Sequence, residues 1–386
     1  MNFQRVIWRN GNGWIIRFVS VSLILSLLWA CSAPATDSRT DILERLRPQV
    51  SPARNEALRR AAVWTATNVE AADIRRGPPD PDGFTFLASV DCEYVDEPLN
   101  GHSLKFACDA GNGDIVKVKF GEANGEVYGE VAATRLLWAL GFGADRMYPV
   151  RVTCHGCPSR FGGVSSSSDV STFDPAVIER SMAGARFEDD PGWSWPELEL
   201  VDEEGGGAPR AHRDALKLLA VFLQHSDNKT EQQRLLCVDE PLSPRPERCA
   251  RPFLMLDDVG LTFGRANFIN NNAVAGANLE RWSRTPVWKD ASGCVGNLPR
   301  SFTGTLSNPP IGEEGRQFLA DLLLRLSSRQ IQDLFEIGRF GLRQKSAGEA
   351  EGDDVIDEWV RIFNRKRDEV VTRRCQMGSS RTPGNG

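Results

Sequence analysis

One loop, residues 225–233, gathers acid, amine and amide side chains that could act together on a ligand. It reads His-Ser-Asp-Asn-Lys-Thr-Glu-Gln-Gln, with Asp227 as a carboxylate and Lys229 as an ammonium. An apolar run at residues 215–223 precedes it and predicts a buried helix, so the loop begins where that helix ends. Further along the chain, Asp258 stands in a short acidic motif, Asp-Asp-Val-Gly.

Two strand-like runs separate these acids. They cover residues 234–238 and 252–256, and a Pro-rich loop joins them. A hairpin of this kind brings its two ends together, so we expect Asp227 and Asp258 to face one small volume. Two carboxylates with an amide oxygen are hard ligands that suit Mg²⁺ bound to a polyphosphate.

The segment that follows Asp258 carries a family resemblance. Residues 258–264 read Asp-Val-Gly-Leu-Thr-Phe-Gly. This is similar to the metal motif Asp-Asn-Gly-x-x-Phe-Gly of the secretory-pathway kinases of the Golgi casein kinase type, at four of five defined positions. More distantly, the chain resembles HipA-type and phosphatidylinositol kinases. The resemblance implies an α+β class and a two-lobed protein-kinase-like fold, with a β-rich N-lobe and a mainly α-helical C-lobe.

The resemblance also implies roles for the two acids and the lysine. Asp227 would orient or deprotonate the attacking hydroxyl group, and Asp258 would bind Mg²⁺ or Mn²⁺. Lys229 would contact the transferred phosphate. HipA-type kinases have an asparagine metal ligand five residues after the loop aspartate, where this chain has Gln232. Neither Asn228 nor Gln233 is excluded as the amide ligand.

A lysine upstream would neutralise the nucleotide phosphates. Residues 114–120 alternate in the manner of a strand, which puts Lys117 and Lys119 on the same face and leaves the choice between them open. In the secretory kinases, a bulky residue follows the nucleotide-binding lysine. Phe120 follows Lys119, so the resemblance favours Lys119.

Two neighbouring segments complete the expected nucleotide site. Residues 126–142 predict a helix with one buried stripe, and the resemblance assigns Glu130 to the ion pair with the lysine, with Glu126 one turn earlier as a substitute. The phosphate loop of the secretory kinases, Gly-Thr-x-Leu-Lys, has a counterpart at residues 101–105. Its candidate cofactor-binding residues are Gly101, Ser103 and Lys105.

The first 30 residues predict export. Three arginines precede an uncharged run at residues 18–30, which is shorter than the roughly 20 apolar residues of a membrane span. Leu-Trp-Ala-Cys at residues 28–31 resembles a bacterial lipobox, in which Cys31 would be lipidated and anchor the protein to the membrane. An uncleaved single anchor is the alternative. We expect an exported protein, either membrane-anchored or periplasmic or extracellular.

The remaining eight cysteines favour an oxidising compartment and four disulfides. Their spacing suggests Cys92 with Cys108, Cys154 with Cys157, Cys237 with Cys249, and Cys294 with Cys375. The Cys-His-Gly-Cys motif at residues 154–157 has two other interpretations, a redox pair or half of a zinc site. The third pair would clamp the hairpin that leads to the Asp-Asp-Val-Gly motif.

Charge and composition define the rest of the organisation. The formal net charge of −6 becomes −9 without the three arginines of the signal, so we expect no nucleic-acid partner. Residues 31–80 are interpreted as a tether with a surface helix and residues 81–187 as the N-lobe. A loop insertion at residues 188–210, a C-lobe at residues 211–376 and a disordered tail at residues 377–386 follow.

These patterns predict an exported kinase-like phosphotransferase. It would use ATP with Mg²⁺ or Mn²⁺ to phosphorylate a hydroxyl acceptor, either a protein Ser/Thr side chain or a glycan. One alternative is a catalytically inactive, kinase-like binding module of the cell envelope. A second is a structural envelope lipoprotein. Binding of nucleotide without transfer distinguishes the first alternative.

Overall fold

The computed structural model describes residues 51–101, 103–158, 160–161, 164–165, 169–187, 191–238, 249–264, 276–346 and 354–375. The chain divides into two compact units, Met1–Gln49 and Val50–Gly386, and all described residues belong to the second. The expected signal, the lipidation site at Cys31 and the tail at residues 377–386 lie outside the described residues.

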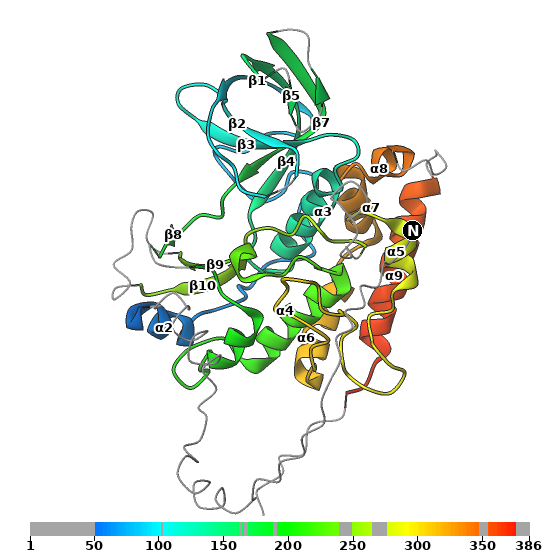
Figure 1. The fold of residues 1–386 in the computed structure, drawn as a ribbon. Helices are drawn as coiled ribbons and strands as arrows, with labels where there is room; N and C mark the ends of the chain where they lie inside the picture. The colour runs from blue at the N-terminus through cyan, green and yellow to red at the C-terminus, as the bar shows by residue number, and fades with distance from the viewer. Residues whose placement is uncertain are drawn as a thin grey trace, which may run out of the picture. The chain divides into compact units, whose positions relative to one another are not determined.

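A closed five-stranded barrel forms the first part of the described chain, at the top of Figure 1. Its strand order is β1-β2-β3-β7-β4, and β1 pairs with β4 in parallel to close it. The side chains inside it are almost all apolar, which fills the small interior. The strands are β1 (Ala88–Val95), β2 (Lys105–Asp109), β3 (Ile115–Phe120), β4 (Arg146–His155) and β7 (Val170–Arg180).

Helix α3 (Glu126–Ala139) packs against the barrel strands β4 and β7 on one side and against α7 on the other. All but one of its residues are buried, Trp138 being the exception. The expectation of a single buried stripe was therefore wrong for this helix. Its sequence is apolar or small nearly all round, and packing on opposite sides buries both faces.

A second sheet of three strands has the order β10-β9-β8, and α4 (Arg210–Leu223) precedes β9 in the chain. The expected hairpin is present as β9 (Gln233–Cys237) and β10 (Pro252–Leu256), and β8 (Ala185–Arg186) pairs with β9. A disulfide between Cys237 and Cys249 joins the hairpin ends away from the loop at residues 225–233.

The rest of the chain is mainly helical (Figure 1). Its helices surround an aromatic cluster in which Phe263 lies within 6.3 Å, centroid to centroid, of Trp282, Phe335 and Trp359. The helices are α5 (Leu279–Arg284), α6 (Glu313–Leu324), α7 (Ser328–Ile337), α8 (Phe340–Ser346) and α9 (Asp354–Thr372). Smaller elements are β5 (Arg160–Phe161), β6 (Val164–Ser165), η1 (Trp195–Leu200) and η2 (Thr230–Gln232).

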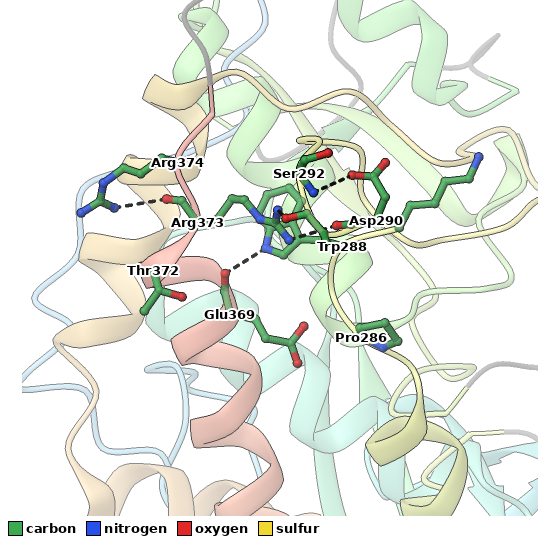
Figure 2. Close-up of a pocket in the computed structure, with 10 residues that line it drawn as sticks. Pro286, Trp288, Asp290, Ser292, Glu369, Thr372, Arg373 and Arg374 are labelled. Atoms are coloured by element: carbon green, nitrogen blue, oxygen red, sulfur yellow. Dashed lines mark hydrogen bonds between the residues drawn. The ribbon is translucent and has the colours of Figure 1, made fainter.

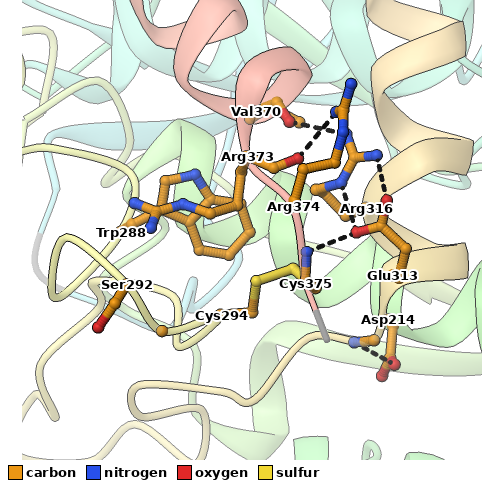
Figure 3. Close-up of a disulfide and its surroundings, with 12 residues drawn as sticks. Asp214, Trp288, Ser292, Cys294, Glu313, Arg316, Val370, Arg373, Arg374 and Cys375 are labelled. Carbon is orange, nitrogen blue, oxygen red and sulfur yellow. Dashed lines mark hydrogen bonds and ion pairs between the residues drawn. A yellow bond between two sulfur atoms is a disulfide. The ribbon is translucent and has the colours of Figure 1, made fainter. Parts of the chain in front are cut away.

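The C-terminal helix is tied down at its end (Figure 3). A disulfide joins Cys294 to Cys375, three residues after α9. Glu313 at the start of α6 accepts hydrogen bonds from the Cys375 backbone N–H at 2.7 Å and from the Arg316 guanidinium. Among the described residues, four disulfides join the cysteine pairs expected from the spacing.

Residues 51–80 are not the expected tether. The helix α2 (Pro52–Arg59) buries Ala57 and Leu58 in the main core and contacts β10. Arg54, with 1% of its side chain exposed, donates to Glu197 Oε1 at 2.5 Å and to the Gly192 carbonyl at 2.9 Å. Arg and Ala in this segment therefore make specific contacts, although their composition suggests a solvated linker.

The expected loop insertion is also more ordered than its composition indicates. Trp193 and Trp195 are fully buried and their rings lie 5.2 Å apart, edge to face. The Trp193 indole N–H donates to the Arg234 and Met255 carbonyls, which fixes this segment against the hairpin.

Among the described residues, none of the helices is long and apolar enough to cross a membrane.

Candidate functional site

Lys119 is the centre of the site, and four carboxylates surround it. Its Nζ lies 2.5 Å from Glu130, 3.4 Å from Glu179, 3.8 Å from Glu126 and 3.9 Å from Asp258. The lysine comes from β3, two glutamates come from α3, Glu179 comes from β7, and Asp258 follows β10. Its side chain is only 1% exposed, so the solvent screens these interactions weakly.

The charges in this cluster are unequal. Burial alone would lower the pKa of Lys119, but the four carboxylates, Asp258 and Glu130 foremost, hold that pKa well above its usual value. Partial burial would raise the pKa of Asp258, but Lys119 and the Gly260 N–H, which donates to its Oδ1 at 3.0 Å, hold it well below its usual range. Asp258 is therefore an anion at neutral pH.

The pKa values of the two helix acids change in the opposite direction to that of Asp258. Burial raises the pKa of Glu130 well above its ordinary value and also raises the pKa of Glu126. One lysine thus faces more negative charge than it can balance, which is the situation that a divalent cation relieves.

Lys117 and Lys119 have different surroundings. β3 pairs with β7 so that Lys117 lies opposite Glu179 and Lys119 opposite Val177. Lys117 forms an ion pair with Glu179 and is about one-third exposed, whereas Lys119 reaches the glutamates of α3. Lys117 lines the cavity described below, whereas Lys119 is buried beside the glutamates of α3.

Gly260 shows why the acidic motif has a glycine two residues after Asp258. A Cβ atom at this position would lie 2.5 Å from Glu126 Cγ, which is shorter than any van der Waals contact. The Thr262 hydroxyl donates to the Val259 carbonyl at 2.9 Å and lies 3.3 Å from the Gly129 carbonyl. Close packing of the motif on α3 therefore holds Asp258 beside the lysine.

The loop at residues 225–233 places its side chains around Asp227. Asp227 Oδ2 accepts from Gln232 Nε2 at 3.0 Å and lies 3.4 Å from Lys229 Nζ. Turning its amide nitrogen to Asp227 leaves the carbonyl oxygen of Gln232 as its coordinating end. The Gln232 backbone carbonyl accepts from the Asp257 N–H at 2.9 Å, which joins the loop to the segment of Asp258.

The other two amides of the loop have different surroundings. Asn228 is buried, donates to the His225 carbonyl at 2.8 Å and accepts from the Leu306 N–H at 2.8 Å. Its side chain therefore holds the loop in place and has no oxygen directed to a ligand. Gln233 is fully buried in β9, away from solvent.

The expected phosphate loop lies on the same side. Lys105 Nζ lies 3.2 Å from Ser103 Oγ, and the Ser103 hydroxyl opposes the rise that burial causes in the pKa of Glu126. Gly101 has φ +93°, and a Cβ atom there would lie 2.7 Å from Lys105 Nζ. The glycine thus allows both the turn and the approach of the ammonium group.

A cavity of about 610 Å³ brings these segments together. Its lining includes Gly101, Lys105, Lys117, Lys229, Gln232 and Asp258. Glu179 also lines it, and sequence reasoning missed this residue. The only signal for Glu179 is its place in an alternating strand, and that pattern does not reveal which strand lies beside it.

The donor set fits a hard divalent cation that arrives with a ligand. Among the described residues, no cluster of three or more His, Cys, Asp or Glu side chains could hold a metal ion. Mg²⁺ is commonly held by one or two carboxylates together with substrate phosphates and water. Asp258 and the Gln232 amide oxygen therefore suffice on the protein side, if phosphate oxygens complete the shell.

A second cavity, of about 720 Å³, lies between α9 and the loop at residues 286–292 (Figure 2). The Arg373 guanidinium lies 5.2 Å from the Trp288 ring and donates to the Asp290 carbonyl at 3.1 Å. Glu369 accepts from the Val287 N–H at 2.7 Å. None of the residues predicted for catalysis, cofactor or metal lines this cavity.

No protein-family model and no curated protein matches the chain. Among solved structures, it is similar to a Helicobacter pylori proinflammatory kinase, CtkA, at 11% identity and a TM-score of 0.42. The match covers 74% of this chain and 98% of that chain. At this score the similarity carries no argument about function, which rests on the geometry of the site.

Proposed function

We propose that this chain is a kinase-like phosphotransferase, with the barrel and α3 as its N-lobe and the helical part as its C-lobe. It uses ATP with Mg²⁺ or Mn²⁺ to phosphorylate a hydroxyl acceptor, either a protein Ser/Thr side chain or a glycan. The observation that carries the proposal is the approach of Glu130 and Asp258 to the Lys119 ammonium within 3.9 Å, from separate elements, beside a charged cavity.

Each side chain has a role in this reaction. Lys119 binds phosphate oxygens and Glu130 positions it, while Asp258 and Gln232 hold the cation. The cation, when bound with the nucleotide, neutralises charge on the phosphates. Asp227 orients the acceptor hydroxyl and takes its proton as the phosphoryl group transfers. Lys229, beside Asp227, contacts the transferred phosphate.

The four disulfides support the further proposal that the protein is exported. Lipidation at Cys31 would anchor it to a membrane.

A second candidate, a nucleotide-binding module without transfer, has one observation in its favour. Asp227 already has Gln232 and Lys229 as partners on the same oxygen, so the base is engaged before any acceptor arrives. Release of ADP in the presence of acceptor hydroxyls separates the two candidates.

Thermal unfolding of the oxidised chain tests the proposal. ATP with Mg²⁺ at about 100 times its dissociation constant should stabilise the fold by about 2.7 kcal/mol, or roughly 5 °C. Asp258→Asn should abolish this shift because the variant loses the anionic ligand of the cation. Asp174→Asn is the matched control, since Asp174 has a similar exposure, pairs with Arg151 and Arg339, and lies outside the cavity lining. Equal shifts in the two variants would end the assignment.

A further inference from the structure

The segment between β7 and β8, residues 181–184, joins the barrel to the second sheet, and Ser181 in it lines the 610 Å³ cavity. We call residues 181–184 the connector. Because Ser181 and Asp258 line the same cavity, a nucleotide held by its phosphates beside Asp258 could place its base against the connector. Adenine has a donor amino group beside a ring-nitrogen acceptor, and backbone recognition of that edge needs one C=O and one N–H.

Two backbone groups of the connector that could serve are already engaged by this chain. The Ser181 carbonyl accepts from Arg146 Nη2 at 2.6 Å, and the Met182 N–H donates to Asp145 Oδ1 at 2.7 Å. The Arg146 guanidinium is also paired with Asp80 at 2.8 Å, and Asp145 is only 2% exposed. The bond from Arg146 is charge-assisted, and a base that displaced the Met182 N–H from Asp145 would leave that buried side chain without its hydrogen-bond donor.

The connector is also fixed in position. The Met182 side chain packs against a small core formed by Leu236, Phe253 and Met255. A Cβ atom on Gly184 would meet the Cys237 carbonyl at 3.1 Å. Rotation of the connector backbone towards a base would therefore disturb its packing on the second sheet.

The composition of the cavity lining also disfavours recognition of a base. Eleven of its 18 residues are charged, and its apolar side chains are those of Pro98, Leu99 and Ile115. Pockets that take a flat ring are usually lined mostly by apolar and aromatic groups. This lining is suited to phosphates and a cation more than to a base.

We infer that the cavity holds its ligand by polyphosphate and divalent cation without reading the base through the connector, so that adenine and guanine nucleoside triphosphates bind about equally. The inference rests on the proposed function and specifies its ligand class. It also explains how so polar a cavity could serve a nucleotide.

Calorimetric titration of the oxidised full chain with Mg²⁺ tests the inference. ATP and GTP should have dissociation constants within about threefold of each other, and inorganic tripolyphosphate should bind within about tenfold of both. Binding of ATP more than tenfold tighter than GTP would overturn the inference and leave the proposed function intact. Binding of none of the three ligands would overturn both.

A pair of variants at Asp145 tests whether the engaged Met182 N–H is what keeps the affinities for ATP and GTP equal. Asp145→Asn keeps an acceptor for the Met182 N–H and should leave the ATP-to-GTP affinity ratio unchanged. Asp145→Ala releases that N–H, which can then donate to the ring nitrogen of adenine. Guanine has an N–H at the corresponding position and cannot accept this bond. The variant should therefore raise the preference for ATP over GTP at least threefold. An unchanged ratio in a folded Asp145→Ala protein would refute this mechanism. If Asp145→Ala does not fold, the wild-type ratio alone decides.

Discussion

Glu130→Gln gives an unusual stability prediction. Breaking a buried ion pair normally destabilises a protein by about 3–5 kcal/mol, because a charge is left unpaired. Here the Lys119 ammonium keeps three other carboxylates within 3.9 Å. Burial also raises the pKa of Glu130 well above its ordinary value, so a neutral amide is a close substitute for this side chain, and the cation is still paired.

The distances give the magnitude. At an effective dielectric constant of about 20, the 2.5 Å contact of Glu130 with Lys119 is worth roughly 6.6 kcal/mol of attraction. The other three acids lie within 3.9 Å of the same Nζ, so each is at most about 6.4 Å from the Glu130 oxygen. Their combined repulsion of a charged Glu130 is then at least roughly 8 kcal/mol. Repulsion matches or exceeds attraction.

We therefore expect Glu130→Gln to change the free energy of unfolding of the ligand-free protein by between about 0 and +2 kcal/mol, as a stabilisation. Urea unfolding at pH 7 measures it. The same variant should lose most of the Mg–ATP-dependent rise in melting temperature, because Lys119 is then drawn towards Glu179 and away from the phosphates.

Lys119→Met is the matched comparison. It leaves four carboxylates around an apolar side chain, so we expect a loss of about 3–5 kcal/mol at pH 7 that becomes smaller as the pH falls and the acids take up protons. A decrease of 3 kcal/mol or more in the free energy of unfolding of Glu130→Gln would refute the reasoning. It would show that the other three carboxylates do not offset the attraction between Glu130 and Lys119.

Two further predictions concern the C-terminal part of the chain. Burial lowers the pKa of Lys366 to about 8, so the buried charge destabilises the fold fully below pH 8 and progressively less as the pH rises to 10.5. Lys366→Met should therefore raise the free energy of unfolding at pH 7 by about 3 kcal/mol. In urea unfolding, the variant should also lack the rise in stability that the wild type shows between pH 8 and 10. The Cys294–Cys375 disulfide spans 81 residues, so replacing both cysteines by serine should lower the free energy of unfolding by about 4.5 kcal/mol in the same assay. A decrease below about 1 kcal/mol would show that the Glu313 contacts alone hold α9 in place.

Local patterns predicted much of the fold. The helices expected at residues 126–142 and 215–223 are present as α3 and α4. The hairpin before Asp258 and the disulfide pairs also agree with the structure. Periodicity and short loop spacings encode these features because each depends on neighbours in the chain.

The sequence also determined which residue types could meet at the site. The order of Lys119, Glu130, Asp227 and Asp258 suggested a phosphate-handling cleft before any distance was known. The approach of Glu130 to Lys119 belongs to the same prediction, since the helix follows the strand directly.

Only the tertiary structure decided what surrounds these residues. Glu179 reaches Lys119 because β3 pairs with β7 in one register, and a strand pattern of period two does not specify its partner strand. Burial of Arg54 and Trp193 likewise depends on segments more than 30 residues away. Composition describes the average environment of a segment, whereas a buried polar contact depends on which distant atoms come within hydrogen-bonding distance.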